Sequence, residues 1–162
     1  MSMRIGFGYD VHAFTPNRPL ILGGVPIPFD SGLSGHSDAD TVIHAIVDAL
    51  LGAAALGDIG THFPSNDPRW KDQPSTLFLD YTYALLCQHN YKISNVDATI
   101  VAESPKLAPY LQEMRKHLAE HLHLPIGQVS VKATTTDGLG FAGRQEGIGC
   151  YAVALIAERG KI

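Results

Sequence analysis

The chain has 162 residues, enough for one domain with a buried core and too few for a second domain of ordinary size. Charged residues make up only 17% of it and hydrophobic residues 45%, so we expect a globular protein whose surface is partly covered by further copies of itself. The net charge of −4, without any Lys/Arg-rich run, argues against nucleic-acid binding and against attachment to a membrane. Two cysteines without metal-type spacing, and no apolar stretch of transmembrane length, predict a cytoplasmic protein.

The first predicted strand covers residues 4–11, where apolar side chains alternate with polar residues and glycines. Such glycines let a neighbouring backbone approach closely. Asp10 and His12 are two residues apart, so both point to the same face of an extended strand, and Asp10 lies opposite the apolar residues. Residues 20–28 then predict a short, hairpin-like strand region that is interrupted by glycines and prolines.

A polar loop precedes an apolar helix that we expect over residues 41–56. Asp40, His44 and Asp48 recur at intervals of four and therefore share one helix face, opposite most of the core residues. Carboxylates in these places are ordinarily a helix cap and a solvated charge. Beside a functional histidine we favour a second role, in which Asp40 and Asp48 help to hold the imidazole of His44.

Asp10, His12 and His44 form the candidate metal site. A strand carboxylate, a strand imidazole and a helix imidazole can converge on one cation as three N/O ligands. A fourth tetrahedral position then stays open, which is the layout of a catalytic zinc site.

The rest of the chain predicts two more helices and three more strands. We expect helices at 75–90 and 108–122 and strands at 95–102, 128–133 and 147–157, with the last strand central because it is apolar throughout. Gly57 is expected to end the first helix. This order predicts an α/β (α+β) sandwich, in which one mostly β-sheet layer is covered on one side by about three helices. The uncovered face should be buried by self-association.

Three further polar segments lie at predicted strand or helix ends: His36-Ser37, residues 58–60 and residues 134–137. A helix N-terminus with an adjacent His and a Ser hydroxyl suits a phosphate group, because free amides and the positive end of the helix dipole both point at it. Together with the metal ligands, these segments indicate phosphoryl chemistry on a small diphosphate, with cations rather than lysines balancing its charge.

Six segments of the chain carry a family resemblance: Gly8–His12, Gly35–Asp40, Asp48–Gly60, Asn95–Asp97, Ser104–Lys106 and Lys132–Gly147. In this order they resemble the 2-C-methyl-D-erythritol 2,4-cyclodiphosphate synthases of the non-mevalonate isoprenoid pathway, over essentially the whole chain. The resemblance implies a homotrimer with its active sites between neighbouring subunits. It also implies a phosphorus-oxygen lyase, in which the 2-phosphate of 4-diphosphocytidyl-2-C-methyl-D-erythritol 2-phosphate attacks the β-phosphorus and expels CMP.

The resemblance further implies roles for individual residues. Asp10, His12 and His44 would hold zinc or another divalent transition metal, and Asp137 would bind Mg²⁺ or Mn²⁺ together with the substrate diphosphate. His36 and Thr135 would stabilise the transition state. The expected substrate contacts are Ser37, Asp58, Ile59, Gly60, Phe63, Asp67, Ala102, Pro105, Lys106, Leu107, Ala108, Thr134, Thr136, Phe141 and Arg144, with residues 102–108 forming the cytidine pocket.

At four positions the chain departs from the family pattern. Asp137 stands where Glu is usual, Ser65 where Asp is common, Glu103 in place of a small or amide residue, and Leu107 where Met is frequent. These changes affect loop contacts and the geometry of the second metal, and leave the zinc ligands intact.

Two other functions compete with the synthase. A metal-dependent phosphohydrolase would use the same three ligands to activate water and would release a linear product. A trimeric binding protein for isoprenoid phosphates, without turnover, would have no need of the three metal ligands.

Overall fold

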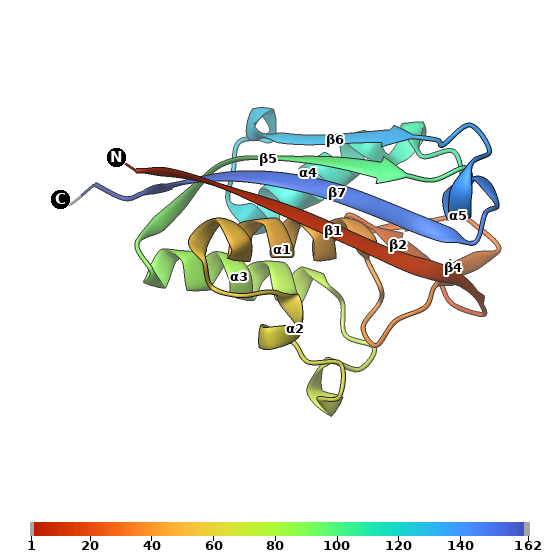
Figure 1. Cartoon of the computed structure of the whole chain (residues 1–162), viewed down its shortest axis with the longest axis horizontal. Helices are drawn as coiled ribbons and strands as arrows, with labels where there is room; N and C mark the ends of the chain where they lie inside the picture. The colour runs from red at the N-terminus through yellow and green to blue at the C-terminus, as the bar shows by residue number, and fades with distance from the viewer. Residues whose placement is uncertain (1, 161–162) are drawn as a thin grey trace.

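The structure, a computed structural model, describes residues 2–160 and contains a five-stranded sheet in the order β4-β1-β7-β5-β6 (Figure 1). The strands of this sheet are β1 (Met3–Pro16), β4 (Ser31–Leu33), β5 (Tyr91–Val101), β6 (Val129–Thr134) and β7 (Gly147–Glu158). The α-helices are α1 (Thr41–Ala54), α2 (Ile59–His62), α3 (Thr76–Gln88), α4 (Leu111–Leu122) and α5 (Gly140–Gly143). A separate hairpin is formed by β2 (Leu20–Leu22) and β3 (Val25–Ile27), and short 3-10 helices are η1 (Pro68–Trp70), η2 (Ala108–Tyr110) and η3 (Ile126–Gln128).

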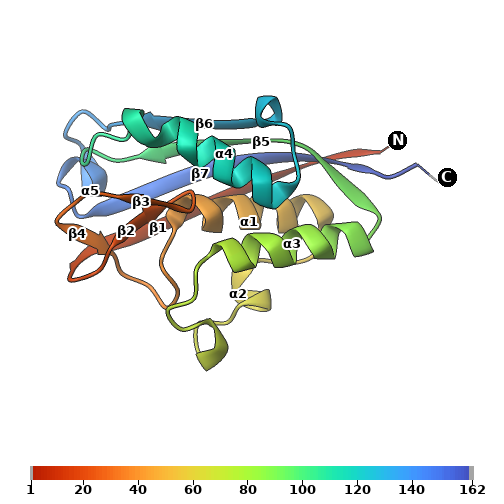
Figure 2. The ribbon, with the colours of Figure 1, turned by 180° about the vertical axis from the view of Figure 1, so that it is seen from behind.

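The three longer helices, α1, α3 and α4, lie on the same face of the sheet, as the view from behind shows (Figure 2). The predicted one-sided α/β sandwich is therefore confirmed. Within residues 2–160, no helix is long and apolar enough to cross a membrane.

β7 is the central strand, as its continuous apolar sequence predicts. It pairs antiparallel with β1 on one side and with β5 on the other, and β5 pairs in parallel with β6. Its alternate side chains from Ile148 to Ile156 are buried. Because Gly8 of β1 pairs with Ala152, these side chains share the face on which Gly8 meets α1.

α1 lies against β1 at a distance that only glycine permits. A Cβ atom added to Gly8 would lie 2.0 Å from the carbonyl oxygen of Ala45, far inside any allowed contact. Asp10 is two residues further along the same strand face, and His44 precedes Ala45 on the helix. The close approach of strand and helix therefore brings the Asp10 carboxylate against the His44 imidazole.

The apolar side chains of β1 lie on the uncovered face of the sheet. Ile5 is 73% exposed and Phe7 63%, and Tyr9 stacks on Tyr151 of β7 with ring centroids 4.8 Å apart. The half-buried strand predicted for residues 4–11 thus buries its glycine face, because that face admits the helix backbone. Its apolar face is open in the single chain, in front of the helices in Figure 1.

Several boundaries differ from the sequence prediction: β1 runs on to Pro16, and β5 begins at Tyr91 instead of residue 95. The first long helix ends at Ala54, because Ala55, two residues before Gly57, takes a left-handed φ of 57° and turns the N–H of Leu56 back to the carbonyl of Leu51. Residues 58–60, expected in a loop, open the short helix α2 because the Asp58 side chain accepts from the N–H of Thr61. Strand β4, which pairs with the end of β1, was not predicted.

Candidate functional site

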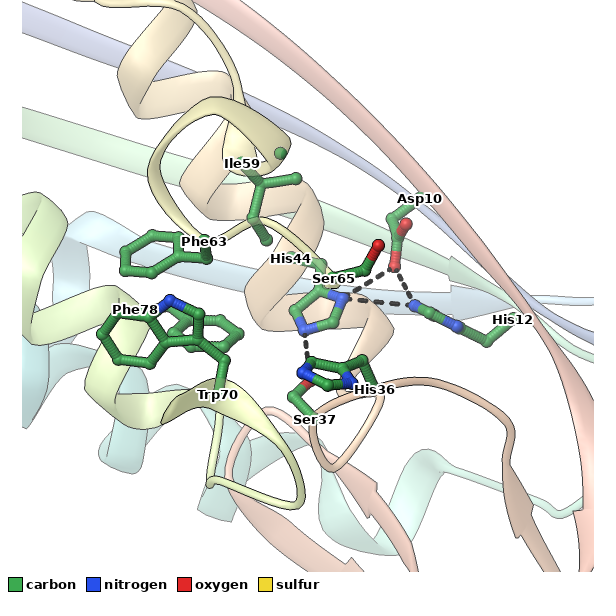
Figure 3. A pocket seen from close by; sticks show the side chains of 11 residues that line it. Asp10, His12, His36, Ser37, His44, Ile59, Phe63, Ser65, Trp70 and Phe78 are labelled. Carbon is green, nitrogen blue, oxygen red and sulfur yellow. Dashed lines mark hydrogen bonds and ion pairs between the residues drawn. The ribbon is translucent and has the colours of Figure 1, made fainter. Parts of the chain in front are cut away.

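Asp10, His12 and His44 converge as predicted (Figure 3). Asp10 Oδ2 lies 2.9 Å from His12 Nε2 and 3.3 Å from His44 Nδ1, and the two ring nitrogens lie 3.2 Å apart. Zinc–ligand bonds of about 2.0–2.1 Å at tetrahedral angles place neighbouring ligand atoms about 3.3–3.4 Å apart. The three atoms therefore have nearly the spacing of one face of a tetrahedral coordination shell.

The hydrogen bonds on the far side of each ring fix which nitrogen carries a lone pair. His12 Nδ1 lies 2.6 Å from the carbonyl oxygen of Ser34, which can only accept, so Nδ1 carries the proton and Nε2 is free for a metal. His44 Nε2 lies 2.8 Å from the hydroxyl of Ser75 and 3.2 Å from that of Ser37. Its Nδ1 accordingly faces the other two ligands.

The local charge also suits a cation. Asp10 Oδ2 is a buried atom without a hydrogen-bond partner of good geometry within residues 2–160. Burial raises the pKa of Asp10, but the adjacent His12 and His44 outweigh it and lower that pKa overall. Burial in turn lowers the pKa of His12, and the Asp10 carboxylate more than reverses this effect. A divalent ion at this point would supply positive charge to the unpaired carboxylate oxygen.

The partners expected for the His44 imidazole prove wrong. Asp40 is fully buried and accepts from the N–H groups of Gly23, Gly24 and Ile43, so it caps α1 and ties it to the β2–β3 turn. Burial raises the pKa of this carboxyl to about 6.

Asp48, one turn beyond His44, accepts from the N–H of Ile59 at 2.7 Å and so anchors the start of α2. The imidazole is held by Ser75, which lies just before α3. Ser75 could not be recognised from the sequence, because a Ser at a helix start is ordinarily a cap, yet its hydroxyl makes no cap hydrogen bond here.

The loop with His36 and Ser37 is fixed from both sides. Arg18 donates to the carbonyl oxygens of Gly35, at 2.7 Å, and of Ser37. His36 Nε2 lies 2.8 Å from the carbonyl oxygen of Asp67, which accepts from it. The backbone of the 63–67 segment thereby contacts the predicted catalytic histidine.

A cavity of about 230 Å³ opens beside the metal ligands. Among the predicted residues, His36, Ser37, Ile59, Gly60 and Phe63 line it, together with Ser65. Its far wall is aromatic, since Phe63 stacks on Phe78 at 4.3 Å and Trp70 meets Phe78 edge-on at 5.5 Å. Trp70 and Phe78 were not predicted as site residues, because aromatic residues at such positions usually serve packing alone.

A second cavity, of about 320 Å³, lies at the ends of β5 and β6. Its lining includes the predicted Ala102, Pro105, Lys106, Leu107, Ala108, Thr134 and Thr135, with Glu103 and Ala133. The two cavities share no lining residue. His36 and Thr135, both predicted to stabilise the transition state, are therefore not brought together within one chain.

The remaining predicted residues line neither of these cavities. Asp137 is exposed, and its carboxylate accepts from the Thr135 hydroxyl at 3.4 Å. Thr136 donates to Glu103 from its N–H at 3.2 Å, and exposed Arg144 pairs with Glu146 at 2.9 Å.

Phe141 touches neither of the two cavities, and its ring lies against Gly149. Asp58 caps α2 and Asp67 caps η1, so local turns occupy both side chains.

Comparison with known proteins identifies the family. A family profile described as the YgbB family matches residues 3–157. The chain belongs to the YgbB family. A relative from Geobacter metallireducens, named 2-C-methyl-D-erythritol 2,4-cyclodiphosphate synthase, is 59% identical over 157 residues, which are 97% of this chain and 100% of the relative. The resemblance stated from the sequence segments is thereby confirmed.

Solved structures agree with the YgbB assignment. The IspF–CDP complex of Plasmodium falciparum matches with a TM-score of 0.86 and 36% identity over 98% of each chain. The bifunctional IspDF from Campylobacter jejuni matches with a TM-score of 0.93 and 40% identity, covering 97% of this chain and 42% of that longer one. At these identities the likeness extends to family as well as fold.

Proposed function

We propose that the chain converts 4-diphosphocytidyl-2-C-methyl-D-erythritol 2-phosphate into the 2,4-cyclodiphosphate and CMP, as a phosphorus-oxygen lyase of the non-mevalonate isoprenoid pathway. Membership of the YgbB family and the synthase names of its relatives support this reaction. The structural observation that carries it is the arrangement of Asp10, His12 and His44, whose ligand atoms face one point at tetrahedral spacing.

Asp10, His12 and His44 hold zinc or another divalent transition metal. When bound, such an ion acts as a Lewis acid that polarises a phosphoryl oxygen. The protein provides no nucleophile, because the substrate carries its own attacking phosphate. The protein holds the substrate in a folded conformation that brings its two reacting phosphates together. Such proximity lowers the activation barrier by roughly 7–11 kcal/mol.

His36 and Ser37 receive phosphate beside the metal ligands. The Ser37 hydroxyl lies 3.2 Å from His44 Nε2, so a phosphate on this loop is adjacent to the metal site. Ile59, Gly60 and Phe63 border the same cavity and suit the small methylerythritol portion. The aromatic wall behind them excludes water from the reacting phosphates.

The second cavity holds the cytidine. Its volume of about 320 Å³ and its lining by residues 102–108 with Thr134 and Thr135 support this role. The CDP complex of the Plasmodium falciparum relative supports a cytidine nucleotide as the ligand. Asp137, at the edge of this cavity, binds Mg²⁺ or Mn²⁺ together with the substrate diphosphate.

The active enzyme is a homotrimer with sites between subunits. Two observations support this assembly: the predicted partners His36 and Thr135 line different cavities, and the apolar face of β1 is open. A neighbouring subunit can cover that face and bring its second cavity to the first. The cytoplasmic location remains a prediction from the cysteine content.

Product analysis tests the reaction against its two rivals. Purified protein with zinc, Mg²⁺ and the diphosphocytidyl substrate is incubated in water enriched in oxygen-18, and the products are examined by mass spectrometry. Unlabelled cyclic diphosphate with CMP is the expected result. A linear, labelled phosphate would assign the chain to the phosphohydrolases, and bound but unconverted substrate would make it a binding protein.

A further inference from the structure

The His44 imidazole is the end of a buried hydrogen-bond chain that the reaction itself does not explain. Ser75, fully buried just before α3, places its hydroxyl 2.8 Å from His44 Nε2. The same hydroxyl lies 2.5 Å from Asp38 Oδ1, and the N–H of Ser75 donates to Asp38 Oδ2 at 3.0 Å. Both oxygens of one carboxylate thus contact one serine.

The number of available protons decides which group donates in each of these hydrogen bonds. A serine hydroxyl has one proton, and a carboxylate such as Asp38 accepts but does not donate. The Ser75 proton therefore goes to Asp38, and the Ser75 oxygen must accept from His44. His44 then carries its own proton on Nε2 and directs the lone pair of Nδ1 toward Asp10 and His12.

Asp38 also fixes the loop that receives phosphate. Its Oδ1 accepts from the N–H of Asp40 at 3.1 Å, and its own N–H donates to the carbonyl of Gln73. The N–H of Asp72 donates to the carbonyl of His36 at 2.8 Å. The 72–75 segment is therefore joined to the 36–38 loop at several points, and one network positions both a metal ligand and the phosphate contacts.

We infer that Ser75 and Asp38 are positioning residues that form a carboxylate–hydroxyl–imidazole relay and hold His44 for metal binding through Nδ1. The inference rests on the proposed metal site. Outer partners of this kind fix the tautomer and orientation of a ligating histidine and raise its basicity, and losing one typically lowers metal affinity by roughly 10- to 100-fold. Ser37, at 3.2 Å from His44 Nε2, is the more distant of the two hydroxyls.

The tautomer of His44 can be measured in the wild-type protein, so this test does not depend on whether the variants fold. Nitrogen-15 NMR of the metal-free chain at about pH 8, above the ordinary range of a histidine imidazole, reports which ring nitrogen is protonated. We expect His44 to carry its proton on Nε2. A proton on Nδ1 would overturn the relay.

Zinc affinity, measured by competition with a chelator, tests the energetic role. Ser75→Ala should weaken zinc binding by roughly 10- to 100-fold. Thr82→Val is the matched control, because Thr82 is another fully buried hydroxyl of the α3 region and donates to the Phe78 carbonyl at 2.7 Å. It should lower thermal stability without changing zinc affinity. Equal affinities for Ser75→Ala and wild type would overturn the inference while leaving the metal site intact, whereas a wild-type protein without zinc affinity would overturn the proposed function as well.

A double-mutant cycle tests whether Asp38 acts through Ser75. If it does, Asp38→Asn weakens zinc binding in the wild-type background and adds little to the loss already caused by Ser75→Ala. Fully additive losses would show two independent effects and would overturn the relay.

Discussion

His12 Nε2 and His44 Nδ1 lie 3.2 Å apart, and the opposite nitrogen of each ring makes a hydrogen bond that leads away from the site. Two imidazole lone pairs and the Asp10 carboxylate thus face the same small volume. Such an arrangement is unfavourable unless a proton or a cation lies among them. The geometry of these three side chains is therefore that of a metal site.

We expect Asp10→Asn, His12→Ala and His44→Ala each to remove bound zinc and nearly all cyclisation while leaving a folded protein. The loss should exceed the roughly 10- to 100-fold drop in affinity that removal of an outer partner causes, because a ligand itself is lost. Metal analysis after dialysis, with circular dichroism for the fold, checks this. His89 is exposed, and His89→Ala serves as the control, which should keep its zinc. Full occupancy in either alanine variant would refute the assignment.

The raised pKa of His12 predicts opposite pH trends for the metal-free and the zinc-loaded protein. A folded-state pKa above the ordinary value of 6.5 means that the His12 proton stabilises the metal-free fold at and below that value, and this contribution is lost as pH rises through the folded pKa. Zinc needs the neutral imidazole, so its affinity should fall as pH drops below the same pKa. Thermal midpoints against pH, with and without zinc, check both trends. His12→Gln should flatten them, and identical profiles for wild type and variant would contradict the prediction.

Much of the fold and the metal ligands followed from local sequence patterns, because period-two and helical spacing decide which residues share a face. Asp10, His12 and His44 are of this kind. Ser75 was beyond reach, because its contact with His44 depends on how the segment before α3 crosses the loop before α1. The sequence pattern of β1 distinguishes two faces of the strand but does not say which of them meets the helix, so the exposure of the apolar face could not be predicted either.

Gly8 sets the separation of β1 and α1, and Gly8→Ala should therefore affect both stability and zinc. A Cβ atom 2.0 Å from the Ala45 carbonyl oxygen forces the backbones apart, and overpacking of this kind costs about 1–3 kcal/mol of unfolding free energy. Moving α1 also moves His44 away from Asp10, so zinc affinity should fall in parallel.

Gly127→Ala is the matched control for this change. Nothing lies within 4 Å of the added atom there, so the variant should be unchanged or stabilised by about 0.4–1 kcal/mol. Chemical denaturation of the two variants compares them directly. Equal stabilities would show that the close approach at Gly8 is not needed.

The open apolar face of β1 predicts a trimer in solution. Side chains such as Ile5 and Phe7, 73% and 63% exposed, form part of an apolar face of the kind that marks an interface. Light scattering should give about three times the 17.4 kDa of the chain. Phe7→Glu should yield monomers that still bind zinc but do not turn over. Leu77→Glu, on the helical side, should remain trimeric, and a wild-type mass near that of one chain would refute the assembly.

Asp137 is expected to bind a second, hard cation that meets the substrate diphosphate. Mg²⁺ commonly uses one or two protein carboxylates, keeps several waters and takes further oxygens from phosphates. An exposed carboxylate beside the Thr135 hydroxyl, at the edge of the second cavity, fits this pattern. The cation should therefore bind well only when nucleotide is present.

Replacing this carboxylate separates the two metals. Asp137→Asn should raise the Mg²⁺ concentration needed for half-maximal rate by roughly tenfold, equivalent to one charge-assisted contact of about 1.5 kcal/mol. Zinc content should not change, because the proposed zinc ligands Asp10, His12 and His44 are different residues. Asp137→Glu keeps the charge and should retain the Mg²⁺ dependence, and Glu120→Gln on α4 controls for the loss of a surface carboxylate. If Asp137→Asn left the Mg²⁺ dependence unaltered, the carboxylate would serve loop structure, and the second cation would need another ligand.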